Sequence, residues 1–598
     1  MRHLRTFVVG LICASMTVAD SPAPVGTRVP EFAATDAITG KMWSLTDSAR
    51  DAKVVVVAFL GTECPISNQY VPTLDALHKR FADRGVAFVA VNSVPQDDAA
   101  TVAKHAKSYA LPFPVLKDAD QSVADKLKAA RVPEAFVLDG TRTVRYRGRI
   151  DDQYGRGVYR PAPTRTDLAD AITAVVEGKE VAAPATEVVG CPLSKPDRTA
   201  KAPTGPVYTF TKDVLPVLQK HCQECHRPGE IGPFSLLTYK QAKAWADAIR
   251  EAVTDSRMPP WHADPAHGSF RNERRLSDAE RKTLLGWIDQ GCAKGVDSDA
   301  PPARTFTDGW QMGTPDEVLT LGEAIPIPAQ APRNGMPYQY RLLGEPFKED
   351  RWVRGSEVRP GDRGVVHHVL LFARPPHAKP IDFKKPVPDQ LFNWVDIFDK
   401  DLIGNGLLGA YVPGSLPAVA PDGMAMRVKK GTQLVLELHY TPNGRKTEDR
   451  VSVGFLYSKE KPKHEIRDRS ILNNSFVIEP FAENHQVKAH TTFDKDAVLL
   501  AFAPHMHLRG KDFEYILTTP GGKPETLLRV PKYDFNWQMK YELTEPRRIP
   551  KGSRIDCVAH FDNSRKNPNN PDPSKRVGWG DQTFQEMMIG FVDYYYPE

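Results

Sequence analysis

Two loop-like stretches divide this chain of 598 residues into three parts that differ in their hydrophobic pattern. Residues 178–206 are rich in proline, alanine, threonine and lysine, and residues 297–304 contain a pair of adjacent prolines. Such stretches interrupt regular structure and mark linkers. Because a chain of this length exceeds a single hydrophobic core, we expect a multi-domain protein of roughly three to five domains.

The composition excludes some classes of partner. The formal net charge is only +5, so the chain offers no strongly basic surface for nucleic acid or for an anionic membrane. Prolines number 52 of 598, which is well above the average of about 5%. This excess favours folds with many turns, such as β-sandwiches, over a helical bundle.

The N-terminus resembles an export signal. Arg2 and Arg5 precede an apolar run over residues 6–18. A membrane anchor is the alternative, but this run is shorter than the ~20 residues that a spanning helix needs, and the residue before Cys13 does not match a lipoprotein cleavage site. No later segment of the sequence is long and apolar enough to span a bilayer. We therefore predict a cleaved signal peptide over residues 1–19 and a periplasmic or secreted protein.

Residues 23–177 alternate short apolar strands with helical patterns. Residues 54–60 form a continuous apolar run, which is typical of a strand buried on both faces. The other expected elements are helices at 67–84 and 167–176 and strands at 87–91, 135–138 and 144–149. This order resembles the thioredoxin-like redoxin family, and Val132–Pro133 stands where that family has a cis-proline beside its active cysteine. The resemblance implies an α/β thioredoxin-like domain.

Cys64 lies between the buried strand and the first helix of this part, where a helix N-terminus favours the reactive thiolate. Thioredoxins have C-x-x-C here, whereas this chain has Ser67 at the second cysteine position. Peroxiredoxins have threonine three residues before the cysteine, whereas this chain has Gly61. Cys191, in the linker, is a candidate resolving partner. Two interpretations stay open: a thiol-active redoxin, or a degenerate redoxin that serves as a docking module.

The motif C-x-x-C-H is formed by Cys222, Cys225 and His226. Its two thiols can form thioethers with a haem, and the adjacent histidine is then placed to ligate the iron. A chance pair of redox cysteines beside an uninvolved histidine is the alternative. Because the motif ends a helical stretch in a chain with a predicted export signal, the sequence predicts one covalently bound haem c.

The surrounding residues 207–296 have a helical pattern and resemble a small all-α cytochrome c. Such proteins usually supply a methionine as the second axial ligand of the iron, and Met258 falls at the corresponding place between two helices. His262 and His267 are the alternative ligands. Cys292 in the same part is expected to be a buried thiol.

Residues 305–598 contain many short apolar strands separated by proline, glycine and asparagine turns. The segments 433–439 and 498–502 are typical of these strands. The pattern predicts two all-β sandwich domains, jelly-roll-like in kind, over residues 305–470 and 471–598.

Histidines gather in this last part of the chain. His505 and His507 are two residues apart, so both can lie on one face of a strand and bind one ion, whereas Met506 between them points away. His367 and His368 would face opposite ways in a regular strand, and joint ligation there requires a bulge or a strand end. Imidazole nitrogens combined with a soft thioether suit copper. A lone histidine in a strand is more often structural, so the prediction depends on the combination.

In their order along the chain these residues resemble the ligands of the copper type II ascorbate-dependent monooxygenases, the family of dopamine β-monooxygenase and the peptidylglycine α-hydroxylating enzyme. The family pattern is a histidine pair and a later histidine on one copper, then H-x-H and a methionine on a second copper. The matching residues are His367, His368, His439, His505, His507 and Met587. The resemblance implies two copper ions, of which one stores and delivers an electron and the other binds O2 for the hydroxylation of a C–H bond.

Several positions depart from the family pattern. The family usually has a disulfide-forming cysteine directly after the ligand methionine, where this chain has Met588, so that Cys557 lacks this partner. Peptide-amidating members bind a substrate carboxylate with an arginine, an asparagine and a tyrosine at positions that here hold Ala503, Ile589 and Phe591. We therefore expect a more apolar substrate than a peptide C-terminus.

Together, the motifs predict an exported copper monooxygenase, an oxidoreductase that acts on paired donors and receives electrons through its fused haem. Its partners would be a small-molecule substrate, O2 and an external electron donor, either a redox protein or an ascorbate-like reductant. Two alternatives remain open. One is a non-catalytic electron-transfer or copper-binding protein, and the other is a thiol-dependent redoxin or peroxidase that acts through Cys64.

Overall fold

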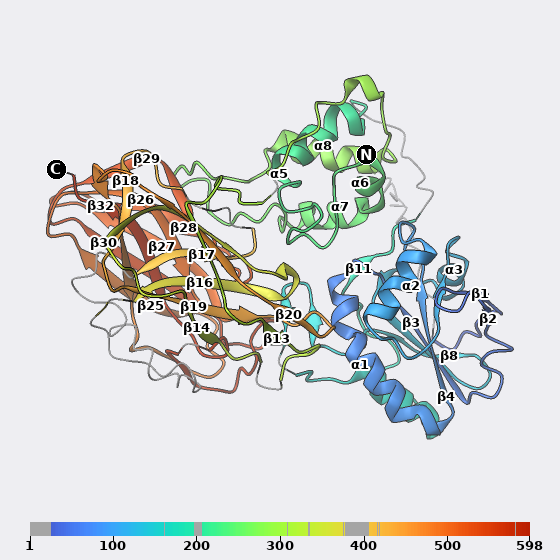
Figure 1. Cartoon of the computed structure of the whole chain (residues 1–598). Helices are drawn as coiled ribbons and strands as arrows, with labels where there is room; N and C mark the ends of the chain where they lie inside the picture. The colour runs from blue at the N-terminus through green and yellow to red at the C-terminus, as the bar shows by residue number, and fades with distance from the viewer. Residues whose placement is uncertain are drawn as a thin grey trace, which may run out of the picture.

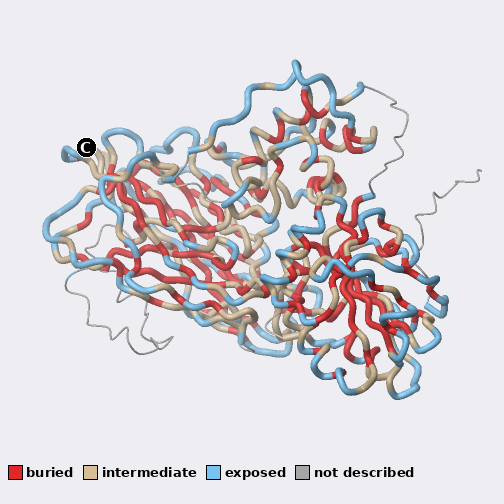
Figure 2. Tube along the Cα trace, turned by 45° about the vertical axis from the view of Figure 1, so that its right-hand side comes forward, coloured by how far each residue is buried: buried red, intermediate tan, exposed pale blue. Residues whose placement is uncertain are grey.

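The computed structural model describes residues 25–160, 162–195, 206–307, 309–332, 335–374, 376, 406–414, 417, 419–580 and 582–597. The predicted signal peptide, Cys13 and residues 196–205 of the first linker lie outside these residues. Figure 1 shows an α/β body, a helical body and a β-rich region in chain order. The buried residues gather inside each of them (Figure 2). The predicted multi-domain organisation, with an N-terminal α/β domain and a β-rich C-terminal region, is confirmed.

The α/β body is built on a seven-stranded sheet in the order β2-β1-β5-β4-β3-β7-β8. Its central strand β3 (Val54–Phe59) is entirely buried, as the apolar run predicts, and lies parallel to β4 (Val86–Asn92) and antiparallel to β7 (Glu134–Leu138). Valine dominates these central strands because a β-branched side chain packs well on both faces of a buried sheet. The remaining strands are β1 (Ala33–Asp36), β2 (Met42–Ser44), β5 (Val115–Lys117) and β8 (Val144–Gly148).

Helices and two short strand pairs complete the α/β body. The helices are α1 (Pro65–Phe81), the 3₁₀ turn η1 (Ala82–Arg84), α2 (Ala99–Ser108), α3 (Ser122–Leu127) and α4 (Asp167–Val176). The antiparallel pairs are β6 (Arg131–Val132) with β11 (Cys191–Pro192) and β9 (Tyr154–Gly155) with β10 (Val158–Tyr159). The predicted cis bond Val132–Pro133 is confirmed. Because β11 belongs to the predicted linker, its pairing with β6 brings the linker back onto this body.

The helical body consists of short helices around an aromatic core. They are a π-helical turn η2 (Phe210–Val214), α5 (Leu215–His221), α6 (Tyr239–Ala244), α7 (Ala246–Thr254), α8 (Asp278–Asp289) and a 3₁₀ turn η3 (Asp297–Asp299). Capping boxes begin α6 and α8, since Thr238 and Ser277 each accept a backbone N–H three residues on. Trp245 and Trp287 are buried in the core of this body.

One segment of the helical part, residues 261–275, packs on the last third of the chain. Trp261 and Phe270 belong to the hydrophobic core of the C-terminal strands, and Phe270 forms an isolated β-bridge with Leu543. Arg271 Nε forms an ion pair with Glu542 at 2.6 Å. The helical part is therefore attached to the β-rich region by a strand-like segment as well as by its chain connection.

The first strands of the β-rich region form two larger sheets around one core. Their orders are β12-β21-β15-β18-β22 and β14-β19-β16-β17, with a separate pair β13-β20. Residues of both sheets, such as Leu436 and Phe455, share one apolar cluster. The strands are β12 (Glu317–Thr320), β13 (Ile325–Ile327), β14 (Gln339–Leu343), β15 (Arg351–Arg359), β16 (Val366–Arg374), β17 (Leu407–Tyr411), β18 (Met424–Val428), β19 (Gln433–Tyr440), β20 (Thr447–Asp449), β21 (Ser452–Tyr457) and β22 (His464–Glu465), with a 3₁₀ turn η4 (Arg363–Val365) before β16.

The remaining strands form two further four-stranded sheets, in the orders β23-β32-β26-β29 and β25-β30-β27-β28, and a pair β24-β31. Phe502 and Tyr515, from different sheets, lie in one core with ring centroids 5.0 Å apart. The strands are β23 (Arg467–Leu472), β24 (Val477–Ile478), β25 (His485–Thr492), β26 (Ala497–His505), β27 (Gly510–Thr518), β28 (Glu525–Val530), β29 (Tyr541–Ile549), β30 (Arg554–Phe561), β31 (Val577–Gly578) and β32 (Ile589–Tyr595).

The α/β body also contacts the β-rich region directly. Gly444 lies so close to helix α1 that an added Cβ would be 1.8 Å from the backbone oxygen of Asn68, and its φ of +94° itself favours glycine. Gln330 Nε2 donates a hydrogen bond to Thr73 Oγ1 at 3.2 Å in the same region.

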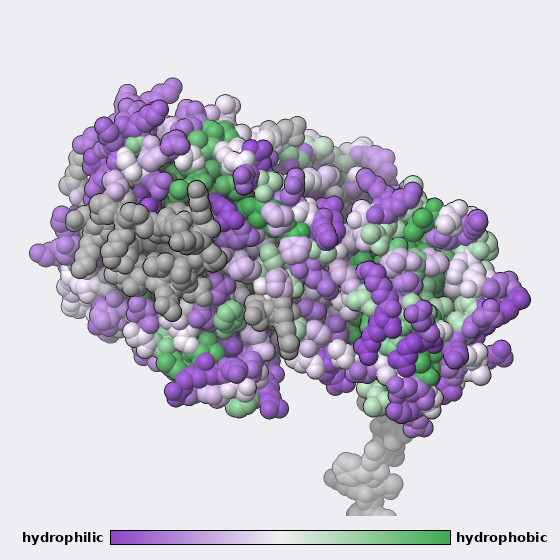
Figure 3. Space-filling model, turned by 60° about the horizontal axis from the view of Figure 1, so that its bottom comes forward, coloured by the Kyte–Doolittle hydropathy of each residue, from purple (hydrophilic) through white to green (hydrophobic). Residues whose placement is uncertain are grey.

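The surface of the molecule is of mixed character. Figure 3 shows one face, on which hydrophilic and apolar residues are interspersed. Within the residues that the structure describes, no helix combines the length and the hydropathy needed to cross a membrane.

Candidate functional sites

A disulfide joins the two cysteines that the sequence singles out in the first part, Cys64 and Cys191. Cys64 is fully buried at the N-terminus of α1, and Cys191 is half-buried on β11. The β6–β11 pairing places Cys191 opposite Val132, whose carbonyl oxygen lies 3.2 Å from Cys64 Sγ. The sulfurs meet because this pairing returns the linker to the cis-proline segment.

Ser67 explains why the partner cysteine comes from the linker. It stands at the position of the second cysteine in C-x-x-C, is 1% exposed, and accepts a hydrogen bond from the Gly61 backbone N–H at 3.3 Å. Gly190, directly before Cys191, has no room for a side chain, since a Cβ would lie 2.2 Å from the Val132 oxygen. The fold and this disulfide define a thioredoxin-like redoxin domain with an unusual cysteine pairing.

The C-x-x-C-H motif lies at the end of α5 in the helical body. Nδ1 of His226 is 3.1 Å from the Phe234 carbonyl oxygen, which only accepts, so Nδ1 carries the proton and Nε2 keeps its lone pair. Burial lowers the pKa of His226, which keeps the ring neutral, and burial raises the pKa of Cys222 to about 12. A neutral imidazole with a free Nε2 beside two thiols fits the donor set that a covalent haem requires.

The three candidates for the second axial ligand of the iron lie in different parts of the structure. Met258 stays at the end of α7, where its backbone N–H donates to the Ala252 oxygen at 3.2 Å. His262 and His267 lie on the segment that packs on the C-terminal strands, and the His262 backbone hydrogen-bonds with the Tyr541 hydroxyl. Met258 as the second axial ligand stays a prediction.

The half-buried His367 and the buried His368 and His439 form one group in the first half of the β-rich region. Each offers one nitrogen, and the three nitrogens lie within 4.8 Å of one another. The register of β16 against β19 shifts between Val366 and His368, so the bulge that joint ligation requires is present, and the Nδ1 atoms of His367 and His368 are 3.1 Å apart. The sequence-based expectation of a bulge is confirmed.

The chemistry of this group suits a metal ion. Burial lowers the pKa of His367 and of His368 to about 3 and that of His439 well below its usual value, so all three rings are neutral donors. Nε2 of His367 and Nδ1 of His439 are buried and have no hydrogen-bond partner among the described residues. Unpaired buried nitrogens are costly unless a ligand satisfies them. The residues present therefore fit a copper ion.

His505 and His507 form the second group, at the end of β26. Their ring centroids are 5.2 Å apart. Nδ1 of His505 bonds to Gln538 Oε1 at 2.8 Å and Nδ1 of His507 to the Gln585 oxygen at 3.3 Å, which leaves both Nε2 atoms for a ligand. Met506 is fully buried in the core, as expected for a packing residue.

Met587 is held next to this second group by its neighbour Glu586. The Glu586 carboxylate accepts hydrogen bonds from the backbone N–H groups of His507 at 2.9 Å and Arg509 at 2.6 Å. Burial raises the pKa of Glu586 to about 8, and Arg509, 1% exposed, lies beside it. Met587 itself is 2% exposed. The structure thus brings the predicted H-x-H and methionine ligands into one neighbourhood.

Sequence reasoning missed the residue that lies between the two histidine groups. Phe535 stacks on His367 with ring centroids 4.7 Å apart, and its ring is 5.9 Å from that of His507. Tyr338 packs on His439 of the first histidine group, with ring centroids 4.4 Å apart. No local motif marks these aromatic residues, since their role depends on contacts between distant segments.

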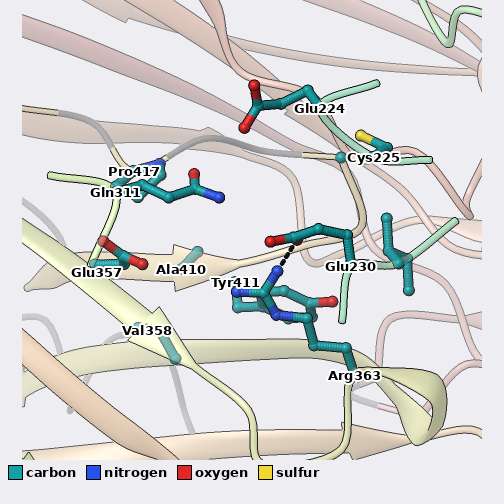
Figure 4. A pocket seen from close by; sticks show the side chains of 12 residues that line it. Glu224, Cys225, Glu230, Gln311, Glu357, Val358, Arg363, Ala410, Tyr411 and Pro417 are labelled. Atoms are coloured by element: carbon teal, nitrogen blue, oxygen red, sulfur yellow. Dashed lines mark ion pairs between the residues drawn. The ribbon is translucent and has the colours of Figure 1, made fainter. Parts of the chain in front are cut away.

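A pocket lies between the haem motif and strands β15 and β17 of the β-rich region (Figure 4). Cys225 lines it on one side and Tyr411 on the other. Glu230, four residues after His226, forms a short ion pair with Arg363, which precedes His367 by four residues. Both side chains are only 14% exposed. The haem-motif loop is therefore bound to the turn that leads into β16.

Comparison with known proteins identifies the N-terminal part. Residues 25–147 match the AhpC/TSA family model. Thiol-disulfide oxidoreductase ResA from Bacillus subtilis (strain 168) is 32% identical over 114 residues, which are 19% of this chain and 61% of that protein. ResA from Bacillus anthracis is 29% identical over 115 residues, 19% of this chain and 64% of that protein. The chain thus spans less than two thirds of the length of these relatives.

Solved structures give matches of similar extent. A hypothetical protein from Sinorhizobium meliloti 1021 is 33% identical, and the match covers 29% of this chain and 96% of that one with a TM-score of 0.27. An uncharacterised conserved protein from Geobacillus kaustophilus is 30% identical, with 29% and 94% covered and a TM-score of 0.27. The family match confirms the redoxin prediction. It supports the thiol-dependent alternative more than copper hydroxylation. The haem and copper sites stay predictions.

Proposed function

We propose that this chain is an oxidoreductase with two reaction centres: thiol–disulfide exchange at Cys64–Cys191, and copper-dependent hydroxylation in the β-rich region. The first part of the proposal is carried by the disulfide, which lies inside the part of the chain that is similar to thiol-disulfide oxidoreductases. The second is supported by the nitrogens of His367, His368 and His439, which lie within 4.8 Å of one another, and by the neighbouring rings of His505 and His507.

The burial of the two sulfurs gives the direction of the thiol reaction. Cys64 is buried and Cys191 half-buried, so an external thiolate reaches the Cys191 sulfur first. The S–S bond breaks, a mixed disulfide forms on Cys191, and Cys64 leaves as a thiolate. The N-terminus of α1 stabilises that thiolate and makes it the better leaving group. A second external thiol then resolves the mixed disulfide, so that a dithiol is oxidised and the pair is reduced.

A trapping experiment tests the thiol reaction. The full-length protein is incubated with a small dithiol, quenched with an alkylating reagent, and each cysteine is assigned by mass spectrometry. Cys64→Ser has no internal disulfide, so it is incubated with a small disulfide instead: the Cys191 thiolate attacks it, one external thiolate leaves, and we expect Cys191 to carry the mixed disulfide. We expect turnover of a model disulfide substrate to be lost in both Cys64→Ser and Cys191→Ser. Cys557→Ser, at a buried thiol of the β-rich region, is the matched control. Undiminished turnover in Cys64→Ser would refute the thiol proposal.

In the β-rich region, His367, His368 and His439 would hold one copper, and His505, His507 and Met587 the other. Bound copper would supply one-electron chemistry with O2, which converts a C–H bond to an alcohol. The protein supplies the surroundings: Gln538 and Gln585 fix the imidazole tautomers, and Phe535 and Tyr338 exclude water from the histidines.

The surroundings of His505 favour an apolar substrate. In the pairing of β26 with β32, His505 lies opposite Ile589, and Ala503 lies opposite Phe591. The Phe591 ring is 6.5 Å from the His505 ring. These are the positions at which peptide-amidating relatives of the resembled family bind a carboxylate. The apolar side chains here would instead contact a hydrocarbon group.

Isotope incorporation tests the hydroxylation. The copper-loaded protein is incubated with a reductant, ¹⁸O2 and a panel of alkyl-aromatic compounds, and products are identified by mass spectrometry. We expect one ¹⁸O atom per product alcohol, with loss of product in His505→Ala and no loss in His490→Ala, at an exposed histidine of β25. Full copper binding without any labelled product would favour the non-catalytic copper-binding alternative.

The haem motif would deliver the electrons. Cys222 and Cys225 would hold the haem and His226 its iron, and the haem supplies one-electron transfer. The contact that supports this role is the Glu230–Arg363 ion pair between the haem-motif loop and the turn before β16. Arg363→Gln is expected to slow electron delivery to the copper centre without changing haem content. Haem oxidation that is kinetically unconnected to O2 consumption would contradict the role.

A further inference from the structure

The helical body packs beside the Cys64–Cys191 disulfide. A pocket beside the disulfide is lined mainly by the redoxin domain and closed by Ala244 and Trp245 of the helical body. The side chain of Trp245 hydrogen-bonds with the carboxylate of Glu63, the residue before Cys64. Cys191 packs against the cores of both bodies. The disulfide therefore lies at the interface between the redoxin domain and the helical body.

Two arginines of the redoxin domain hydrogen-bond with the residue before Cys191 at this interface. Arg131 and Arg156 donate to the Gly190 carbonyl oxygen at 2.9 and 3.2 Å. Both also form short ion pairs with Glu251 on α7, and the three side chains are only 25% to 30% exposed. One carboxylate of the helical body thus contacts both arginines that bind the residue before Cys191.

Aromatic rings continue from this interface to the haem motif. Trp245 stacks on Phe234 with ring centroids 4.0 Å apart and an interplanar angle of 11°. The Phe234 ring is 4.7 Å from the His226 ring, and the Phe234 carbonyl accepts the Nδ1–H of His226. An unbroken series of ring contacts therefore runs from the pocket beside the disulfide to the histidine that is predicted to ligate iron.

We propose that the helical body is the electron acceptor of the reduced Cys64–Cys191 pair, with Trp245 and Phe234 as the positioning residues of the electron route. This inference rests on the haem of the proposed function. The two thiols lose two protons to water and form the S–S bond, and their two electrons pass one at a time to ferric haem. An external one-electron acceptor, or the copper centre, removes each electron from the haem in turn. An external dithiol restores the thiols by the exchange reaction described above.

A stepwise oxidation of the full-length, haem-loaded protein tests the route. The protein is fully reduced, freed of reductant without oxygen, and mixed with two equivalents of ferricyanide, each of which removes one electron from the haem. Haem absorbance and the alkylation state of Cys64 and Cys191 are then followed together. We expect the haem to become reduced again while thiols of this pair disappear, and we expect this phase to be lost in the double variant Cys64→Ser/Cys191→Ser.

Variants at Trp245 separate a positioning role from a structural one. Trp245→Leu is expected to slow the reduction of the haem by the thiol pair, while the reduction potentials of haem and disulfide, measured at equilibrium, stay unchanged. Trp245→Phe is expected to restore part of the lost rate. Unchanged rates in Trp245→Leu, or thiols that persist beside oxidised haem in the wild-type protein, would overturn the inference. Absence of a c-type haem spectrum would instead overturn the haem part of the proposed function.

Discussion

Removal of the Cys64–Cys191 disulfide is expected to destabilise the redoxin domain strongly. The bond joins residues 127 positions apart, so it closes the part of the domain from α1 to β11 into one loop, while β1, β2 and β3 precede this loop. The chain-entropy model gives about 5 kcal/mol for a loop of this length, and measured losses for native disulfides are about 2–5 kcal/mol. We expect Cys191→Ser to lower the unfolding free energy of the domain within that range.

Hydrogen exchange in the full-length protein measures this loss locally. The slowest amides of β3 and β4 exchange through opening of the whole domain, so their rates should rise roughly 30-fold to roughly 4,000-fold. Wild-type protein treated with a dithiol should behave like the variant, and Cys557→Ser should behave like untreated wild type. If β3 and β4 keep their protection in Cys191→Ser, the disulfide does not constrain the domain and the account of its role is wrong.

Three further substitutions test other contacts. Gly444→Ala places a Cβ 1.8 Å from the Asn68 oxygen, so we expect the redoxin domain to separate from the β-rich region, seen as faster limited proteolysis between them. Phe535→Ala removes the ring between the histidine groups. We expect denaturant unfolding of the copper-free β-rich region to show an unfolding free energy lower by about 3–5 kcal/mol, and Phe535→Leu should lower it less. Although burial raises the pKa of Glu280, hydrogen bonds from Lys220 and the Ser277 N–H lower it from 4.5 to about 2. The ionised carboxylate therefore stabilises the fold above pH 4.5. The thermal midpoints of wild type and Glu280→Gln should differ at pH 6 and converge as the pH falls toward 2. A difference that stays constant with pH would contradict this.

The redoxin domain could be predicted from the sequence because its signals are local. The run of valines in β3 has to be buried on both faces, and the helix after Cys64 begins at Pro65, a residue that suits the first helical turn. The cis bond before Pro133, expected from the resemblance to the redoxin family, is confirmed.

Contacts between distant segments could not be predicted in this way. The sequence offered Cys191 as a partner of Cys64, but only the β6–β11 pairing determines that the two sulfurs meet. Phe535 and Gln538 contact the histidine groups, yet both lie in a stretch without a recognisable motif. Glu586 directly precedes the predicted ligand Met587, but its contact with the His507 backbone depends on the fold. Their roles follow from which strands become neighbours, and this depends on the packing of the whole region.

The bulge at His367 could be predicted from the sequence only in part. Two adjacent histidines that bind one ion require an irregularity in the strand, so its presence could be argued from stereochemistry alone. Its partner strand β19 and the position of His439 opposite His368 depend on sheet register, which the sequence did not determine.

The central claim of this account is that the two histidine groups bind copper in a chain that also carries one haem. Elemental analysis of the copper-loaded, full-length protein, set against its haem content, tests this claim most directly. We predict two copper ions per haem, falling to one in the double variant His505→Ala/His507→Ala and remaining two in His490→Ala. Haem at full occupancy with no bound copper would contradict the claim and would leave thiol–disulfide exchange as the remaining proposed activity.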